Sequence, residues 1–514
     1  MQSFNRTKQS KKKTIFKISG IVLIVLIVVS GLYGWKHRRG IRIMLNQVGV
    51  TSLTRQDMDD IEKKVKGSKD YRIPDYKEDS LLTNVPSSKA YNEKTGKWET
   101  VYVWDSWPVT MPDGTVANYH GYRLTMGLTK AGGRADAAGA KIGLYAQKIS
   151  DDSTDVSSWQ YLGNVFATYG EGRDKSKSDK WLDDIQSEWS GTTTLMKSSD
   201  STLRVFYTNA MLRGNQGQAL TTAQVSVEPK DGSDWDSGLT INHEKAKDHK
   251  TVFVGDGKIY QSVDQAVMKG KAGDSFAMRD PHFVTDGDKW YLTFEGNTGT
   301  DYGYQGENNF KHAKYFGSNA FLKKEVTRLK KKENENEYNW SYLANSALGK
   351  LELNKDFTVK KIMKPMVTGN ATIDETERPN LFEYKGKWYL FTCFWGDKFA
   401  QSNPYLKGKT YMFGYVSDNG INGTYKPLNG NGLVLQSNTP GPDPRIAYAW
   451  LVVKPSKIVD DRFVVTSFQE SRTFSPSFIL EIKGNKTKMI TDRVLDQGAL
   501  ETTGKTYSAK SASA

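Results

Sequence analysis

The stretches RDPHFVTDGDKWYLTFEG (279–296) and ERPNLFEYKGKWYLFTCF (377–394) share one design. Each opens on a charged cluster, continues as an apolar strand, turns at a glycine and returns as a second strand that begins Lys-Trp-Tyr. Aromatic and β-branched residues on both sides of a Gly-containing turn are typical of a β-hairpin. The two stretches therefore predict one antiparallel unit that is repeated along the chain.

Three looser copies of this unit occur elsewhere in the sequence and begin at residues 104, 188 and 448. They read WDSWPVTMPDGT…HGYRLTMGL from Trp104, EWSGTTTLMKSSDSTLRVFYT from Glu188 and YAWLVVKPSKIVDDRFVVTSF from Tyr448. Five small sheets arranged radially make a β-propeller, whose innermost strands line the centre. We therefore predict an all-β fold, a five-bladed β-propeller with a central active-site cavity. A sandwich or jelly roll would leave unexplained why every unit opens on polar or aromatic residues.

The propeller is expected to occupy residues 91–505, followed by a polar tail at 506–514. Residues 36–90 are polar and charged, and we assign them to a connector with a short helix around residues 57–66. Helical periodicity is otherwise scarce, apart from a lysine-rich stretch whose charges predict a solvated surface.

The net charge of +14 is concentrated at the N-terminus. Residues 1–55 hold eleven Lys and Arg and no Asp or Glu, which leaves +3 on the other 459 residues. A nearly neutral body argues against a nucleic-acid partner.

The leader has the form of an export signal. Residues 1–17 form a basic region expected to stay in the cytoplasm, and residues 18–35 carry no charge over eighteen positions. Such a segment is a signal peptide or a transmembrane anchor. Both alternatives place the body outside the cell, secreted or tethered to the outer face of the membrane, with membrane contact only through this segment.

Acidic residues stand at the openings of three units. Asp105 lies in VWDSWP, Asp280 in MRDP, and the pair Glu375 and Glu377 in DETERPN. Cleavage of a glycosidic bond with retention uses two carboxyl groups, one as nucleophile and one as acid/base. A single Asp at a turn is usually a cap or a solvated group. Three acids at equivalent places in repeated units instead predict one catalytic centre.

The motifs VWDSWP, EWSG, RDP and DETERPN, in this order, resemble the bacterial fructansucrases: levansucrases, inulosucrases and related β-fructofuranosidases. The resemblance covers residues 104–500 and is closest to levansucrases of Gram-positive type. It implies a five-bladed propeller that cleaves sucrose, releases glucose and transfers the fructosyl unit to fructan, sucrose or water. It also implies a monomer whose partners are sucrose and fructan acceptors.

The resemblance assigns roles to individual residues. Asp105 resembles the nucleophile that forms a covalent fructosyl intermediate, Glu377 the general acid/base, and Asp280 the transition-state stabiliser. The sucrose pocket is implied at six further positions: Trp104, Trp189, Ser190, Arg279, Glu375 and Arg378.

A calcium site is also implied by the resemblance. Its ligands map onto Asp274, Gln305, the main-chain carbonyl of Leu343, Asn345 and Asp374. An all-oxygen set with two carboxylates suits Ca²⁺ and not Zn²⁺. Because Asp374 precedes Glu377 by three residues, we expect a structural ion that braces the acid/base segment.

One position departs from the family pattern. Trp395 stands where many levansucrases carry an arginine that contacts sucrose, and a Trp cannot supply the bidentate hydrogen bonds of an Arg. The alternatives that stay open are a transferase making levan, an inulosucrase forming β-2,1 links, a β-fructofuranosidase that mainly hydrolyses sucrose, and a non-catalytic sugar-binding propeller.

Overall fold

The structure is a computed structural model, and it describes residues 40–74, 76, 83–132, 137–150, 155–211, 217–303, 305–437, 447–503 and 506–508. The chain divides into two units, Met1–Val48 and Gly49–Ala514. In the first, the described part is short, and residues 40–46 are helical. The expected leader, 1–17 and 18–35, lies outside the described residues. Among the residues that are described, no helix has the length and apolarity needed to cross a bilayer.

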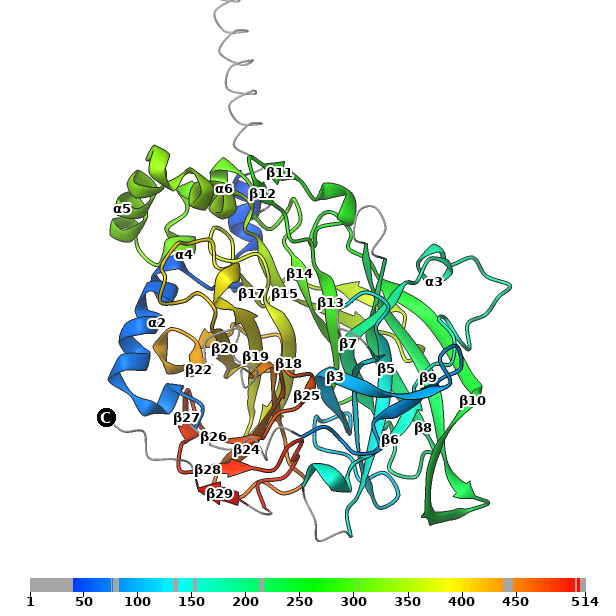
Figure 1. The fold of residues 1–514 in the computed structure, drawn as a ribbon. Helices are drawn as coiled ribbons and strands as arrows, with labels where there is room; N and C mark the ends of the chain where they lie inside the picture. Colours follow the sequence, from blue (N-terminus) through cyan, green and yellow to red (C-terminus); the bar gives the residue numbers. More distant parts are fainter. Residues whose placement is uncertain are drawn as a thin grey trace, which may run out of the picture. The chain divides into compact units, whose positions relative to one another are not determined.

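Five antiparallel sheets make up the second unit (Figure 1). The first two sheets contain β2 (Lys89–Asn92), β3 (Lys97–Thr110), β4 (Tyr122–Ala131), β5 (Lys141–Lys148) and β6 (Gln160–Asn164), then β7 (Ser187–Thr194), β8 (Thr202–Ala210), β9 (Gln218–Asp231) and β10 (Asp234–Phe253). A short parallel pairing of β3 with β7 joins them. The third sheet contains β13 (Met278–Asp286), β14 (Lys289–Asn297), β15 (Ser346–Leu353), β16 (Val359–Ile362), β17 (Val367–Thr368) and β1 (Thr51–Ser52).

The last two sheets follow the same plan. They contain β18 (Glu377–Tyr384), β19 (Lys387–Trp395), β20 (Thr410–Ser417), β21 (Lys426–Pro427) and β22 (Leu433–Gln436), then β23 (Ala447–Val453), β24 (Arg462–Gln469), β25 (Thr473–Phe474), β26 (Phe478–Lys483) and β27 (Lys486–Ile490). Two small hairpins add β11 (Met268–Lys269) to β12 (Ala272–Gly273) and β28 (Arg493–Leu495) to β29 (Thr506–Ser508).

The opening strands of the five sheets form a closed ring. β3 contacts β7, β7 contacts β13, β13 contacts β18, β18 contacts β23, and β23 returns to β3. A hydrogen bond from the Val103 N–H to the carbonyl of Arg472, between β24 and β25, also links the first sheet to the fifth (3.0 Å). These strands begin the five units that the sequence predicts, so the five-bladed propeller is confirmed.

Each opening strand is distorted at the same place. The pairing register slips between Trp104 and Trp107, between Arg279 and His282, and at the corresponding points of β7, β18 and β23. A β-bulge of this kind bends the strand and redirects a side chain. In four of the five bulges a non-glycine residue has positive φ: Asp105 (43°), Asp280 (56°), Arg378 (58°) and Ala449 (57°).

Helices cover the outside of the third and fourth sheets. They are α2 (Arg55–Gly67), α4 (Ala313–Phe316), α5 (Asn319–Leu329) and α6 (Glu335–Leu343), while α3 (Lys180–Asp183) precedes β7. A capping box formed by Thr54 and Asp57 starts α2, and its apolar face buries Met58, Ile61 and Val65. The helix expected around residues 57–66 is thus present. It packs into a core cluster shared with β19 and β20, within the segment that we assigned as a connector.

Candidate active site

Arg378 ties together the strands that carry the three predicted catalytic acids. Its Nη1 donates to the carbonyl of Asp105 and its Nη2 to the carbonyl of Ser106, both at 2.8 Å. Its backbone N–H donates to Oδ2 of Asp280 at 2.9 Å. The neighbouring Glu377 shares the bulge of β18. The structure therefore brings Asp105, Asp280 and Glu377 to one place, although as many as 272 positions separate them in the sequence.

Asp280 is held on both carboxylate oxygens. The hydroxyl of Ser190 donates to Oδ1 at 2.5 Å, and the N–H of Arg378 donates to Oδ2. The backbone N–H of Asp280 donates to Thr208 Oγ1 at 2.9 Å. Its side chain is therefore fixed in orientation at the bulge before any substrate arrives.

Arg279 sits among three glutamates. It donates to Glu295 through Nε (2.7 Å), and its Nη2 reaches Glu375 (2.9 Å) and Glu377 (3.3 Å). Lys398 donates to the other oxygen of Glu375 at 2.5 Å. Two cations thus share three carboxyl groups, so the cluster favours one proton held on a carboxyl.

The pKa of Glu377 is raised well above its ordinary value. Burial is the main cause; Glu295, Glu375 and Asp280 add to it, while Arg279 opposes it. Glu375 is also buried, but Arg279 and Lys398 hold its pKa below the ordinary value. Glu377 is therefore the carboxyl placed to carry a proton near neutral pH.

The pKa of the nucleophile candidate, Asp105, is also shifted from its ordinary value. Burial raises the pKa of Asp105 to about 6, with Asp280 adding to the shift and Arg378 and Arg472 opposing it. Asp105 is thus ionised above about pH 6, and the pKa of Glu377 is raised well above its ordinary value. An acid whose surroundings raise its pKa is suited to the general-acid role.

The predicted pocket residues lie beside these acids. Trp104 is buried next to Asp105, with the guanidinium of Arg472 at 5.3 Å from its ring. Trp189 is half-buried and donates through Nε1 to the carbonyl of Ala137 (3.0 Å). Ser190, Arg279, Glu375 and Arg378 make the contacts given above.

The residues expected to bind calcium also meet in the structure. Asp274 Oδ2 accepts from Gln305 at 2.5 Å, and Asp374 Oδ1 accepts from the backbone N–H of Asn345 at 3.2 Å. Leu343 is the last residue of α6, where main-chain carbonyls lack helical partners. Among the described residues, no group of three or more His, Cys, Asp or Glu is arranged to hold a metal, so this set depends on amide and carbonyl oxygens.

Two observations test whether a cation fits these residues. Within the described residues, Oδ1 of Asp274 and Oε1 of Gln305 are buried and accept no hydrogen bond. The pKa of Asp374 is raised well above its ordinary value by burial and by the nearby Asp274. Two neighbouring acids, with one open carboxylate oxygen and one open amide oxygen beside them, are an arrangement that a hard divalent cation stabilises. The donor set therefore fits Ca²⁺.

Comparison with known proteins agrees with this geometry. Residues 44–500 match the family model described as Levansucrase/Invertase. The chain belongs to the levansucrase/invertase family. A levansucrase of Bacillus amyloliquefaciens is 41% identical over 466 residues, covering 88% of this chain and 91% of that protein. The crystal structure of Bacillus subtilis levansucrase superposes with a TM-score of 0.76 at 38% identity, covering 89% of this chain and 98% of that one. A protein of Geobacillus stearothermophilus named an inactive levansucrase is 38% identical and covers 88% of this chain and 90% of its own.

Trp395, at which the sequence predicts a departure from the family pattern, is half-buried. Its ring centroid lies 5.0 Å from that of Tyr448, so the indole is fixed against β23. Lys398, three residues on, is bound to Glu375. Lys398 is therefore already engaged with a carboxylate of the centre.

Glu295 is a member of the centre that the sequence analysis missed. It is fully buried on β14, directly opposite Arg279, and it also accepts from the backbone N–H of Thr376 at 2.9 Å. Burial, Asp280 and Glu375 raise its pKa. The signal in the sequence was an acid in the otherwise apolar strand KWYLTFEG, and the register that places it opposite Arg279 comes from the structure.

Proposed function

We propose that this chain cleaves sucrose by a retaining mechanism, releases glucose and transfers the fructosyl unit, as a levansucrase-type fructosyltransferase. The observation that carries the proposal is the joining of Asp105, Asp280 and Glu377 through Arg378. Family membership alone is not enough, because one relative bears the name of an inactive levansucrase. The support comes from the complete set of three acids, each in an environment suited to its role.

In the first step, ionised Asp105 attacks the anomeric carbon of the fructosyl unit and forms an ester. Glu377 gives its proton to the glycosidic oxygen, and glucose leaves. In the second step, Glu377 takes a proton from an acceptor hydroxyl, whose oxygen displaces Asp105 and breaks the ester. Asp280, held by Ser190 and Arg378, is oriented to accept from fructosyl hydroxyls and to stabilise the positive charge of the oxocarbenium-like transition state.

The proposal is tested with Glu377→Gln. An amide of the same shape cannot donate the proton, so glucose release should fall by about 10²-fold or more. Thermal unfolding should change little. Glu383→Gln is the matched control, because Glu383 lies on the same strand but outside the carboxylate cluster. Glucose release at the wild-type rate from Glu377→Gln would remove Glu377 from the role of acid/base.

Transfer is proposed over hydrolysis as the main outcome, with fructan and sucrose as acceptors. The ratio of glucose to free fructose separates the two, because hydrolysis releases equal amounts and transfer leaves excess glucose. Carbon NMR of any polymer then distinguishes β-2,6 from β-2,1 links. Equal release from sucrose at every sucrose concentration would favour the β-fructofuranosidase alternative.

Calcium is proposed as a structural ion at Asp274, Gln305, Leu343, Asn345 and Asp374. When bound, it would neutralise the two buried acids and brace the segment that leads to Glu377. A chelator should then lower the melting temperature of the full chain, and Ca²⁺ but not Mg²⁺ should restore it. Asp274→Asn should abolish this response. An unchanged melting curve in excess chelator would count against the site.

Export of the body and a monomeric state are proposed on the leader and the family resemblance. Activity should be recovered outside the cell, in the medium or on the outer face of the membrane. Sedimentation should give the mass of one chain. Activity confined to the cell interior, or a stable dimer, would contradict these proposals.

A further inference from the structure

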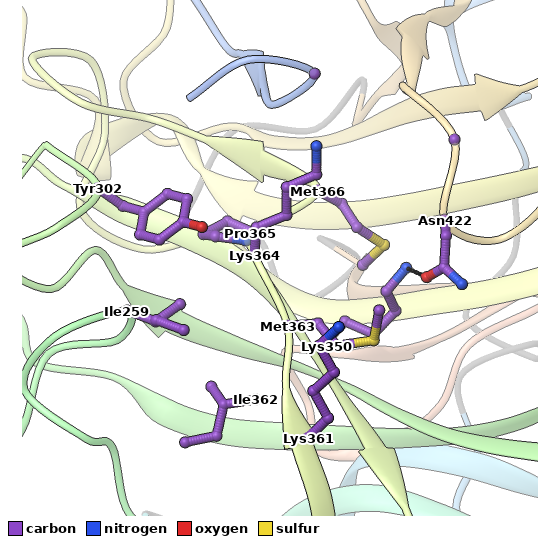
Figure 2. Close-up of a pocket in the computed structure, with 12 residues that line it drawn as sticks. Ile259, Tyr302, Lys350, Lys361, Ile362, Met363, Lys364, Pro365, Met366 and Asn422 are labelled. Atoms are coloured by element: carbon purple, nitrogen blue, oxygen red, sulfur yellow. Dashed lines mark hydrogen bonds between the residues drawn. The ribbon is translucent and has the colours of Figure 1, made fainter. Parts of the chain in front are cut away.

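A second cavity lies away from the carboxylate centre, between the third and fourth sheets (Figure 2). Its volume is about 330 Å³. Its charged lining consists of Lys350 on β15, Lys361 on β16 and Lys364 in the loop that follows, and no Asp or Glu lines it. A pocket with three lysines and no lining carboxylate has the electrostatics of an anion site.

Lys350 is the inner cation of this pocket. Lys350 is only 3% exposed, and its ammonium donates to the Ile421 carbonyl (2.6 Å) and to Asn422 Oδ1 (2.7 Å). An ammonium has three N–H donors, and the two oxygens take two of them. The ring centroid of Tyr291 lies 5.7 Å from Nζ, and a cation–π contact at this distance does not replace an anion. Among the described residues, no carboxylate lies within ion-pair distance of Lys350 or of Lys361.

The lowered pKa of Lys350 shows that its buried charge is destabilised. Burial lowers the pKa of Lys350 to about 7, and the nearby Lys364 lowers it further, against a weaker opposing effect of Asp286. A buried charge that lacks a counterion is destabilising unless something compensates it. A bound anion would supply the missing counterion.

The remaining lining defines the shape of the ligand. Ile259, Ile362, Met363 and Met366 contribute apolar surface, and Tyr302 faces the pocket from the loop after β14. The volume is about ten times the share of one water molecule, and it lies at the lower end of the range for small-ligand pockets. It exceeds what a bare oxyanion needs and leaves room for a small body attached to one.

We propose that this pocket binds a phosphate-class oxyanion, either inorganic phosphate or the phosphate group of a small phosphomonoester, with Lys350 at its base and Lys361 and Lys364 at its rim. The site is independent of the fructosyl-transfer centre, and the proposal does not rest on that activity. Lys350 already connects β15 to the loop after β20 through its hydrogen bonds to Ile421 and Asn422, and a bound anion would add Lys361 and Lys364 to this connection.

The test uses the full chain and two probes, inorganic phosphate and glucose 6-phosphate. Each is titrated by calorimetry against a chloride buffer of equal ionic strength without added Ca²⁺. Saturable binding of either probe is expected. Equal affinities would identify the free ion as sufficient, and tighter binding of the monoester would show that the apolar lining also contributes.

Matched variants distinguish a specific anion site from nonspecific charge attraction. Lys361→Gln should weaken binding by roughly tenfold, the usual value of one charge-assisted hydrogen bond. Lys360→Gln removes the same charge from the adjacent residue of β16, which pairs with Glu352, and should leave the affinity unchanged. Lys350→Met should abolish binding while sucrose cleavage is retained. The proposal is overturned if neither probe binds saturably, or if Lys360→Gln weakens binding as much as Lys361→Gln.

Discussion

Replacement of Arg55 by Met tests what attaches the N-terminal helix to the propeller. Arg55 is 2% exposed, and its guanidinium donates to Glu325, Glu337 and Ser341 at 2.8 Å. It also donates to the carbonyls of Ala371 (2.9 Å) and Ala400 (2.7 Å). One side chain therefore links α2 to α5, to α6 and to two loops of the propeller.

The expected loss of stability in Arg55→Met follows from the groups that lose Arg55 as a partner. Met fills a similar volume but donates nothing, so two buried carboxylates lose one of their cations and the Ala371 carbonyl loses the Arg55 donor, while the Ala400 carbonyl keeps the Ser341 hydroxyl. Arg328, which contacts both carboxylates, limits the effect. Removal of one partner from a buried ion pair costs about 3–5 kcal/mol. An unfolding entropy of about 2.1 cal/mol/K per residue over Gly49–Ala514 gives roughly 1 kcal/mol per degree, so the melting temperature should fall by about 4 °C.

The assay is thermal unfolding followed by circular dichroism at two scan rates, with Lys66→Met as the control. Lys66 lies on the same helix but is exposed, pairs with Glu62 and lies 5.7 Å from the ring centroid of Tyr405, so its loss should shift the transition by less than about 1 °C. Equal shifts for the Arg55 and Lys66 variants would refute the reasoning.

Three other predictions concern charge and pH. Asp280→Asn should keep the fold, because an amide oxygen can still accept from Ser190, but sucrose cleavage should fall by about 10²-fold or more, as measured by glucose release. The pH profile of kcat/KM should be bell-shaped: the rate should fall below about pH 6 as Asp105 becomes protonated, and fall again at higher pH as Glu377, whose pKa is raised, loses its proton. A profile without an acidic limb near pH 6 would contradict the role of Asp105. For stability, burial opposes ionisation of Glu325, but Arg328 and Arg55 lower its pKa from 4.5 to about 2. This contribution is present above pH 4.5 and is lost as the pH falls towards 2, so the melting temperatures of wild type and Arg55→Met should converge at low pH.

The repeated units and the three acids could be predicted because both leave local signals. A Lys-Trp-Tyr strand after a glycine turn marks each clear unit, and an acid at a strand opening is visible in the sequence. Glu295 could not be found in this way, because one acid in a strand normally indicates a solvent-facing position. Only the register of β13 with β14 shows that it faces Arg279.

Long-range ion pairs were also beyond prediction from the sequence. The lysine-rich stretch at residues 322–332, which overlaps α5, was expected to be a solvated surface, yet its Glu325 is buried against Arg55, 270 positions earlier. The partner of such a charge depends on which helix packs across it. The lysines of the second cavity illustrate the same limit, because β15, β16 and the loop after β20 meet only in the folded chain.

The positive φ angles at Asp105 and Asp280 restrict how this centre can be altered. Asp and Asn enter the left-handed region more readily than other residues with a side chain, and glycine enters it freely. An alanine scan at these two positions would mix lost chemistry with a changed preference of the main chain, so a weakened variant could be misread. Evolution faces the same restriction: a centre that has lost its acid can keep its shape with Asn or Gly, and its activity can then return through a single codon change. Inactive and active members of such a lineage can therefore remain nearly superimposable.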